Sequence, residues 1–372
     1  MNLSILSLVI FLAVFAGVVF IHEFGHFLVA RLLKVEVEEF GFGLPPRLIK
    51  MFRWKGTDFT LNWLPIGGFV RPKGENDPTV EGGLAAASPW TRLAVLFAGP
   101  SMNLLLGVAV FSLLFMQMGV PDYTQVQIAD VLANSPASQA GIQLGDIVVS
   151  ANGVIIHDPT QLHDLIYANL DKAIQFTLRR GNQTVDATAS PSSSRPKDQG
   201  ALGISMGPAL VRTGSVVDSV RYGALAVEAQ ARLLILLPAQ LIRGQLSPEE
   251  SRFVGLKGIY DLFGQAVSRD VQSREPNPPA TSGTPASQTP TYFTLQLIGI
   301  LTISLGILNL FPFPALDGGR IFFILPELVL RRRLPPEWEN RINAVGMALL
   351  LALMVYVNVM DFVNPVVVVL PK

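Results

Sequence analysis

The chain has 372 residues, no cysteine and a formal net charge of zero; half of its residues are hydrophobic and only 15% are charged. Its mean hydropathy of +0.43 is too high for a soluble protein of this length, so we expect an integral protein of a lipid bilayer with several membrane spans. The lack of cysteine excludes disulfides and thiolate metal ligands, and the absence of a basic tail argues against a nucleic-acid partner.

Four stretches are apolar and long enough to span a membrane: residues 3–33, 93–118, 292–316 and 344–362. The first has no basic n-region and no small-residue cleavage site, so we interpret it as a retained helix rather than a signal peptide. A fifth candidate, residues 224–242, is interrupted by Glu228, Arg232 and Pro238. For this stretch an amphipathic helix on the membrane surface is favoured over a span.

Basic residues predict the orientation of these spans. They gather in two loops: Arg31, Lys34, Arg47, Lys50, Arg53, Lys55, Arg71, Lys73 and Arg92 after the first span, and Arg320, Arg331, Arg332, Arg333 and Arg341 after the third. Short loops rich in Lys and Arg stay in the cytoplasm, so both termini and residues 119–291 are expected on the other side. The pattern fits a bacterial plasma membrane or an equivalent thylakoid or organellar membrane.

The first span ends in an H-E-x-x-H motif formed by His22, Glu23 and His26. On a helix this spacing places two imidazoles on one face, one turn apart, with a carboxylate beside them. The set suits zinc, with the histidines as ligands and the glutamate as a base toward water. Ionisable groups in a membrane helix are costly and indicate a functional site. Gly25, which has no side chain, would let another helix or a substrate approach closely.

The first cytoplasmic loop contains a predicted β-hairpin. Within residues 59–70, two short β-prone runs are separated by Pro65, Gly67 and Gly68. The stretch is apolar for an exposed loop. Both a membrane-associated hairpin and an ordinary cytoplasmic one are compatible with its periodicity.

Residues 124–206 have the composition of a small α/β domain. Strands are predicted at residues 126–131, 147–151, 174–179 and 184–189, with a helix that begins near Asp158 and runs to Asn169. Residues 134–148 followed by Asn152-Gly153 resemble the PDZ-domain signature of bacterial proteases. PDZ domains accept an extended peptide as an added strand. The candidate peptide-binding residues are Gly200, Leu202, Gly203 and Ile204, with a simple turn as the alternative.

The chain therefore divides into five predicted segments. Residues 268–290 are rich in Pro, Ser and Thr and are expected to form a disordered linker. The segments are 1–118 (two membrane helices, the H-E-x-x-H motif and the hairpin loop), 119–208 (PDZ domain), 209–267 (amphipathic, interfacial), 268–290 (linker) and 291–372 (two further membrane helices).

Asp317 is the best candidate for a third zinc ligand. A catalytic zinc normally has three protein ligands, and the remaining histidines, His157 and His163, lie in the extracytoplasmic domain. Asp317 follows Pro312 and Pro314, which break the third span; broken backbone at membrane depth lines a cavity or a protein contact. The first and third spans run in the same direction, so their cytoplasmic ends can meet. A helix cap is the alternative role for this carboxylate.

Together these features resemble the site-2 protease family, and within it the RseP-type bacterial regulators. The resemblance rests on H-E-x-x-H in the first span, N-x-x-P-x-P-x-L-D-G at residues 309–318 and a PDZ domain between the second and third spans. It extends to residues 41–43, 65–70 and 98–103. It implies a polytopic α-helical membrane protein with four spans, a membrane-associated β-hairpin and one extracytoplasmic PDZ domain.

The resemblance also implies an intramembrane zinc metalloendopeptidase that takes part in regulated intramembrane proteolysis. Its substrates would be single-span membrane proteins, of the anti-sigma-factor type or remnant signal peptides. The implied site has Glu23 as catalytic acid/base, one Zn²⁺ per chain on His22, His26 and Asp317, and substrate contacts from Asn309, Pro312 and Pro314 and from Gly67, Gly68 and Phe69 of the hairpin. The single PDZ domain and the long linker depart from the best-known enterobacterial type.

Two other functions deserve comparison with a protease. A membrane-anchored PDZ adaptor without activity would not need the complete set of metal ligands and catalytic glutamate, all of which are present. A transporter with a discontinuous third helix would explain the Pro and Gly break but not H-E-x-x-H. The complete set favours the protease.

Overall fold

The computed structural model divides the chain into a helical unit, formed by Met1–Leu113, Val220–Asp270 and Tyr292–Val367, and a β-rich unit that contains Leu114–Ser219. Each unit is described by itself. The residues that the structure describes are 3–195, 199–212, 214–244, 252–274, 292–331, 333 and 335–365.

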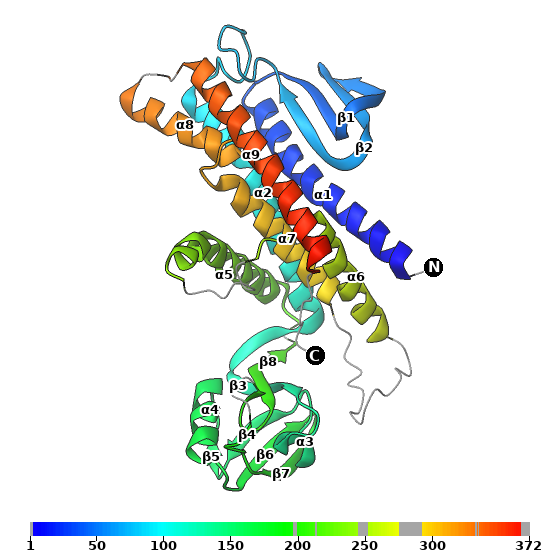
Figure 1. Ribbon diagram of the computed structural model, residues 1–372, viewed down its shortest axis with the longest axis vertical. Coiled ribbons are helices and arrows are strands. Elements are labelled where there is room, and N and C mark those ends of the chain that lie inside the picture. The colour runs from blue at the N-terminus through cyan, green and yellow to red at the C-terminus, as the bar shows by residue number, and fades with distance from the viewer. Residues whose placement is uncertain are drawn as a thin grey trace. The chain divides into compact units, whose positions relative to one another are not determined.

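Long helices form most of the helical unit (Figure 1). Those at the four predicted spans are α1 (Leu3–Leu32), α2 (Pro89–Met118), α7 (Phe293–Leu310) and α9 (Pro336–Val363). The third span was predicted to continue to residue 316, but α7 ends at Leu310, because Pro312 and Pro314 together remove two backbone N–H donors and clash with the preceding turn. By length and composition, α5 (Val216–Ile242) could also cross a membrane, which gives five candidates among the described residues. Figure 1 shows α5 lying across the other helices.

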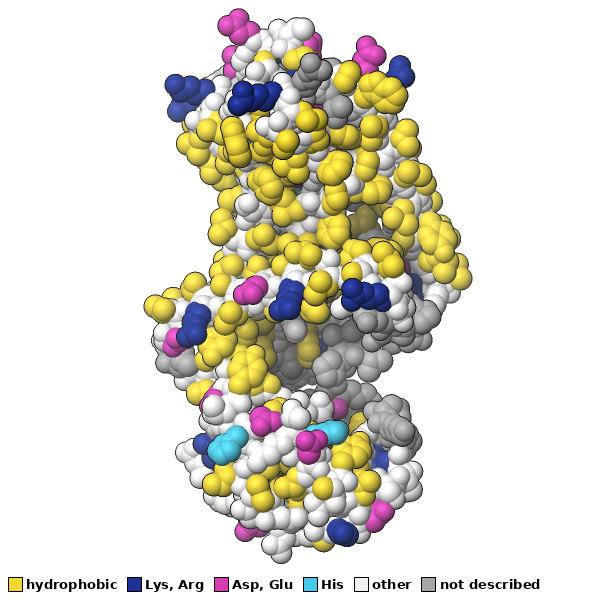
Figure 2. Space-filling model, turned by 90° about the vertical axis from the view of Figure 1, so that its left-hand side faces the viewer, with side chains coloured by type: hydrophobic (Ala, Val, Ile, Leu, Met, Phe, Trp, Pro, Cys, Tyr) yellow, Lys and Arg dark blue, Asp and Glu magenta, His cyan; other side chains and the backbone are white. Residues whose placement is uncertain are grey.

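The outer surface of the helical unit is apolar. Exposed side chains on the outside of the bundle include Val9 of α1 and Leu349 and Val355 of α9, which are 53%, 59% and 59% exposed. Figure 2 shows hydrophobic side chains over most of the visible face of this unit, with charged side chains at the end that carries β1 and β2 and again along α5. Such a surface is stable only when lipid covers it.

The loop between α1 and α2 forms a hairpin of β1 (Val37–Trp54) and β2 (Thr57–Pro72), which pair antiparallel. The predicted turn near Pro65–Gly68 is wrong: the chain turns at Lys55 and Gly56, whose φ angles are 46° and 88°, and β2 continues through the Pro and Gly residues. Phe40 of β1 has Cα partners on both sides, Phe59 and Val70. The two strands therefore bend, and both halves of β2 lie beside the first half of β1.

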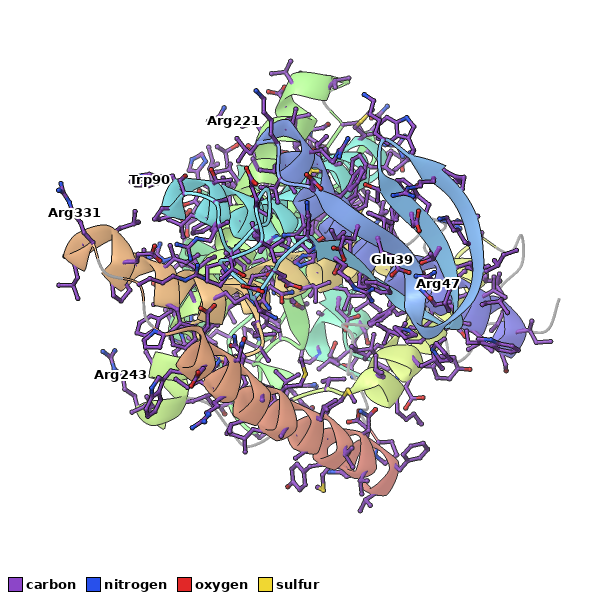
Figure 3. The ribbon with its side chains drawn as sticks, turned by 90° about the horizontal axis from the view of Figure 1, so that it is seen from above. Glu39, Arg47, Trp90, Arg221, Arg243 and Arg331 are labelled. Carbon is purple, nitrogen blue, oxygen red and sulfur yellow. The ribbon has the colours of Figure 1, made fainter. Side chains whose placement is uncertain are left out.

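A buried carboxylate links the parts of this hairpin. Glu39 is 4% exposed and accepts hydrogen bonds from Arg47 Nη2 at 2.9 Å and Thr60 Oγ1 at 2.8 Å, while Arg71 Nη1 lies 3.0 Å from its second oxygen. Glu39 and Arg47 can be seen on neighbouring parts of the hairpin in Figure 3. Since the partners come from β1 and both halves of β2, the cluster holds the bent strands together.

Helix α6 (Leu256–Gln272) lies between two capping carboxylates. Asp361 of α9 is fully buried and accepts hydrogen bonds from the backbone N–H of Gly255 (2.8 Å) and Gly258 (3.0 Å), and from Arg252 (2.9 Å). Asp270, near the end of α6, accepts from the N–H groups of Phe293 and Thr294, both at 2.9 Å, at the start of α7. These carboxylates satisfy helix N-terminal N–H groups that have no partner within their own helices.

The helix also corrects the predicted linker. Residues 268–272 belong to α6 rather than to a disordered segment, because Ala266, Val267 and Asp270 are buried and Asp270 caps α7. From residue 275 onward the predicted linker lies outside the described residues.

We expect Asp361→Ala to destabilise the helical unit. The substitution leaves Arg252 and two backbone N–H groups without their acceptor, and removing one partner of a buried ion pair costs about 3–5 kcal/mol. The measurement is the unfolding midpoint in detergent. Asp361→Asn keeps one acceptor oxygen and should lose less stability, so equal midpoints for wild type and Asp361→Ala would contradict this role.

The β-rich unit contains a six-stranded sheet of order β7-β6-β4-β3-β8, with β5 paired to β4. The predicted strands are confirmed, as is the helix: Asp158 is the N-cap of α4 and accepts from Gln161 N–H. Strand β8 continues beyond the predicted boundary at residue 208. The elements are β3 (Val120–Val131), α3 (Pro136–Gln139), β4 (Ile147–Ala151), β5 (Val154–Ile155), α4 (Pro159–Ala168), β6 (Ile174–Arg180), β7 (Gln183–Ala189) and β8 (Ile204–Val211).

Candidate metal centre

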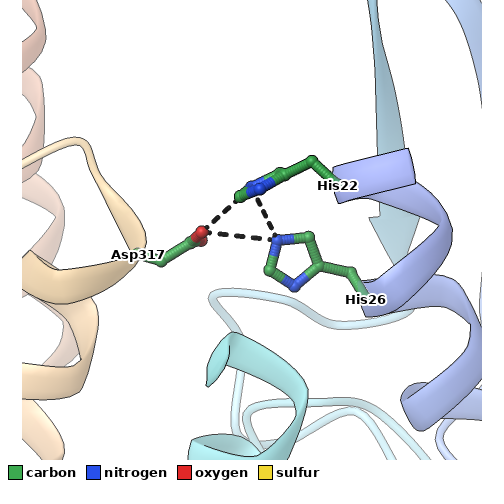
Figure 4. Close-up of side chains that lie close together, drawn as sticks. All are labelled: His22, His26 and Asp317. Carbon is green, nitrogen blue, oxygen red and sulfur yellow. Dashed lines mark hydrogen bonds and ion pairs between the residues drawn. The ribbon is translucent and has the colours of Figure 1, made fainter. Parts of the chain in front are cut away.

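The structure brings His22, His26 and Asp317 together (Figure 4). The histidines lie one turn apart near the end of α1, are 6% and 9% exposed, and their Nε2 atoms are 3.1 Å apart. Asp317 is the first residue of α8 (Asp317–Leu330), and its Oδ2 lies 3.2 Å from His22 Nε2 and 3.3 Å from His26 Nε2. Three potential ligand atoms from two distant segments therefore face one point.

Their spacing fits tetrahedral zinc. Bonds of about 2.0–2.1 Å at tetrahedral angles separate ligand atoms by about 3.3–3.4 Å, close to the three distances seen here. Asp317 Oδ2 is buried and has no hydrogen-bond donor. Among the described residues this is the one group of three His, Asp or Glu ligand atoms close enough to share an ion. The donor set, two imidazoles and a carboxylate, is one that zinc favours.

Helix α2 orients His26. Its Nδ1 lies 2.8 Å from the backbone oxygen of Val95, which can only accept a hydrogen bond, so Nδ1 carries the proton. In a neutral imidazole the lone pair is then on Nε2, the atom that faces Asp317. The backbone of α2 therefore selects the tautomer that can bind a metal.

Two glycines allow α1 and α2 to approach this closely. A Cβ on Gly25 would lie 2.5 Å from the oxygen of Ala98, which confirms the prediction that another helix packs at this position. A Cβ on Gly99 would lie 2.2 Å from Nε2 of His26. Both distances are far below ordinary van der Waals contact, so neither position has room for a side chain.

A tight loop places Asp317. The α7–α8 connection contains Pro312 and Pro314, and the two glycines after Asp317 pack onto it: added Cβ atoms would lie 2.2 Å from the oxygen of Phe311 for Gly318 and 2.3 Å from that of Phe313 for Gly319. The N-cap of α8 is Leu316, without a side-chain cap, so Asp317 faces the histidines instead of capping the helix.

Ion pairs anchor α8, and the sequence reasoning missed them. Arg92 of α2 pairs with Glu327 at 2.5 Å, and Arg320 pairs with Glu75. Arg333, just after the helix, donates to the backbone oxygen of Ala85 at 2.5 Å. Each contact joins residues more than 230 positions apart in the chain. Their residue types alone gave no signal of this pairing.

The predicted acid/base, Glu23, contacts the hairpin. Its Oε2 accepts a hydrogen bond from the N–H of Val70 at 3.0 Å. Beside it is a cavity of about 190 Å³ whose lining is mostly apolar: Ala16, Phe20, Glu23, Phe40, Gly41, Phe42, Gly43, Leu61, Gly67 and Gly68. Two predicted substrate-binding residues, Gly67 and Gly68, thus lie in the same cavity wall as Glu23.

The other predicted substrate residues are placed as follows. The ring of Phe69 lies over Gly41, whose added Cβ would be 2.3 Å from the Phe69 ring. The amide of Asn309 donates to the oxygen of Leu305 in its own helix at 2.9 Å. Pro312 and Pro314 lie in the loop that precedes Asp317.

The predicted PDZ peptide-binding residues lie in the β-rich unit. Gly200 and Gly203 have φ angles of 64° and 72° and form the turn before β8, and Ile204 begins that strand. Strand β8 is at the edge of the described sheet. The side chain of Leu202 is buried in the core, so only its backbone could contact a peptide.

Two kinds of comparison match nearly the whole chain to known proteins. The model of peptidase family M50 matches residues 10–353. A Clostridium perfringens protein named as a zinc metalloprotease is 30% identical over 356 residues, 95% of this chain and 98% of its own length. The zinc metalloprotease RasP of Bacillus licheniformis is 25% identical, with coverage of 95% and 97%.

One solved structure matches a smaller part of the chain. The PDZ domain of an SdrC-like protein from Listeria monocytogenes aligns with 23% of this chain and 90% of its own, at 17% identity and a TM-score of 0.21. The family match, in contrast, extends over nearly the whole chain. This chain belongs to peptidase family M50, the site-2 protease family, and is a zinc metalloprotease.

Proposed function

We propose that this protein cleaves single-span membrane proteins within or next to the membrane, with one zinc ion held by His22, His26 and Asp317. The observation that carries the proposal is the convergence of three ligand atoms, 3.1–3.3 Å from one another, two of which belong to a helix apolar enough to span a bilayer. Substrates of the anti-sigma-factor type and remnant signal peptides both meet this description. Cleavage would then be a step of regulated intramembrane proteolysis.

The chain's own residues supply the proton transfers. Zinc, when bound, acts as a Lewis acid that polarises a peptide carbonyl and makes water nucleophilic near neutral pH. The hydrogen bond from Val70 fixes Oε2 of Glu23 and leaves Oε1 to accept a proton from the attacking water. The same carboxyl then delivers the proton to the leaving amine. His22 and His26 are 6% and 9% exposed, so bulk water would have little access to the ligand atoms.

The hairpin offers a strand edge to an unwound substrate. A helical span hides its peptide carbonyls in hydrogen bonds, so it must open locally before cleavage. The N–H of Val70 points away from β1 toward Glu23, and in an antiparallel pair alternate residues point the same way, so Gly68 shares this direction. An extended substrate pairing with this edge would pass beside Glu23. Asn309, Pro312 and Pro314 would contact it from the Asp317 side.

The cavity beside Glu23 would accept an apolar substrate side chain next to the scissile bond. We expect Ala16→Phe to fill it and to lower kcat/KM for a substrate with Leu at that position about 10–100-fold, with a smaller loss for Ala. Cleavage assays on paired model substrates measure this. Ala13→Phe adds the same ring at an exposed position of α1 and is the matched control. An equal loss for both substrates would contradict the assignment of the cavity.

The basic loops support the proposed orientation, with the metal site toward the cytoplasm and the PDZ domain outside. In that arrangement the predicted PDZ residues Gly200, Leu202, Gly203 and Ile204 would meet the outer part of a substrate. Residues 209–267 would lie at the outer interface. Substrate selection by the PDZ domain would then be separate from cleavage at the metal site.

Reconstitution tests the proposal. Purified protein in liposomes, given a tagged single-span substrate, should cut it within the span or at its cytoplasmic border, as mapped by mass spectrometry of the products. Addition of a membrane-permeable zinc chelator should stop the reaction. Zinc-loaded protein that binds single-span proteins but cuts none of a broad panel would instead favour the membrane-anchored adaptor.

A further inference from the structure

A buried asparagine of α2, Asn103, contacts His22. His22 is the proposed zinc ligand that does not share the backbone hydrogen bond made by His26. Asn103 of α2 is 0% exposed, and its Nδ2 lies 3.2 Å from Nδ1 of His22. Its Oδ1 is buried and has no hydrogen-bond partner. Buried amide oxygens are rarely left unpartnered, so this one calls for an explanation.

The NH₂ group and the oxygen of the Asn103 amide suit the two different tautomers of His22. When Nε2 of His22 carries the proton, Nδ1 is an acceptor, and the amide NH₂ of Asn103 can donate to it as placed in the structure. When Nε2 uses its lone pair for a metal, Nδ1 carries the proton and needs an acceptor. Rotation of the amide by half a turn then presents Oδ1 to Nδ1–H, which also gives the unpartnered oxygen a donor.

We propose that Asn103 is a positioning residue for His22, and that its amide turns over between the metal-free and the metal-bound site. This inference rests on the proposed zinc ligation by His22. Val95 performs the corresponding task for His26, but a carbonyl only accepts and holds one tautomer permanently. The two histidines thus differ. His26 is fixed in the tautomer that can bind a metal, whereas His22 can change tautomer while the amide of Asn103 rotates with it.

The inference predicts opposite results for two substitutions of similar size. In Asn103→Leu the new side chain can neither donate nor accept a hydrogen bond, so His22 loses the hydrogen bond that orients it. Asp can only accept, so it supports the metal-bound form of His22 and adds a negative charge beside a site whose ion carries two positive charges. Removal of such outer hydrogen-bond partners of metal ligands typically weakens metal binding about 10–100-fold.

The experiment measures metal binding rather than cleavage. Wild type, Asn103→Leu, Asn103→Asp and the control Ser112→Ala are purified in detergent and loaded with zinc or cobalt. Ser112 is also a buried polar residue of α2, but it bonds to the oxygen of Val108 in its own helix. Zinc affinity is measured by competition with a chelator, the ligand field by the cobalt absorption spectrum, and folding by the unfolding midpoint without metal.

We expect Asn103→Leu to bind zinc about 10–100-fold more weakly with an altered cobalt spectrum, while Asn103→Asp and Ser112→Ala bind at least as tightly as wild type. Unchanged zinc affinity in Asn103→Leu would overturn the inference, and so would equal losses in the Leu and Asp variants. Failure of the proposed function looks different: His22→Ala or Asp317→Ala would then bind zinc as tightly as wild type.

Discussion

Glu23→Gln is expected to remove cleavage and to leave the zinc in place. Gln has the shape of Glu but cannot take a proton from water or return it to the leaving amine, and loss of general acid–base catalysis lowers rates about 10²–10⁴-fold. The carboxylate is not one of the three converging ligand atoms, and its Oε2 bond to Val70 N–H can be kept by the amide oxygen of Gln. The assay compares single-span substrate cleavage in liposomes with zinc per chain.

The acid/base role of Glu23 requires that the variant loses cleavage but keeps its zinc. A Glu23→Gln protein that keeps its zinc and still cleaves at the wild-type rate would show that another group moves the proton. A variant that loses zinc together with activity would place Glu23 among the ligands instead. Val19→Ala, on the same helix one turn before Glu23, is a conservative change that controls for purification and reconstitution.

Gly99→Ala is expected to lower cleavage by a similar factor, because the variant binds zinc more weakly. The new Cβ would lie 2.2 Å from Nε2 of His26, the proposed ligand atom itself, and within 3 Å of two other ring atoms. Because Nδ1 of His26 is held by Val95, the ring cannot retreat without losing that bond. We therefore expect zinc affinity to fall at least about 100-fold, and cleavage with it. Chelator competition and the cleavage assay report the two losses.

The matched control is the same substitution where space is free. Gly17 lies on α1, and an added Cβ there would meet nothing within 4 Å. Gly17→Ala should therefore keep wild-type zinc affinity and activity. Full zinc binding by Gly99→Ala would mean that the two helices separate easily, and would contradict the view that their glycines set the ligand geometry.

The long helices could be predicted because a sufficiently long apolar stretch indicates a membrane helix by itself. The ends of α1 and α2 agree with the sequence to within a few residues, since their apolar stretches are long, and α2 continues through Pro100. The hairpin turn could not be placed. Pro65 and Gly67 have the residue types of a turn, but pairing of both halves of β2 with β1 outweighs that local preference.

The grouping of the three proposed metal ligands was predictable for two different reasons. Helical spacing alone puts His22 and His26 on one face, whereas Asp317 required the argument that two spans run in the same direction. Asn103 and the Arg92–Glu327 pair gave no such signal. Their roles depend on contacts between distant helices, and one sequence does not show which polar residue of α2 faces which histidine.

The central claim is that His22, His26 and Asp317 hold a zinc ion that performs proteolysis. It is tested most directly by zinc K-edge X-ray absorption and metal analysis of the purified wild type and Asp317→Ala. We predict one zinc per chain in the wild type, ligated by two imidazoles and oxygen, and a loss of that signal in the variant. A wild type without zinc, or an unchanged zinc signal in Asp317→Ala, would contradict the account.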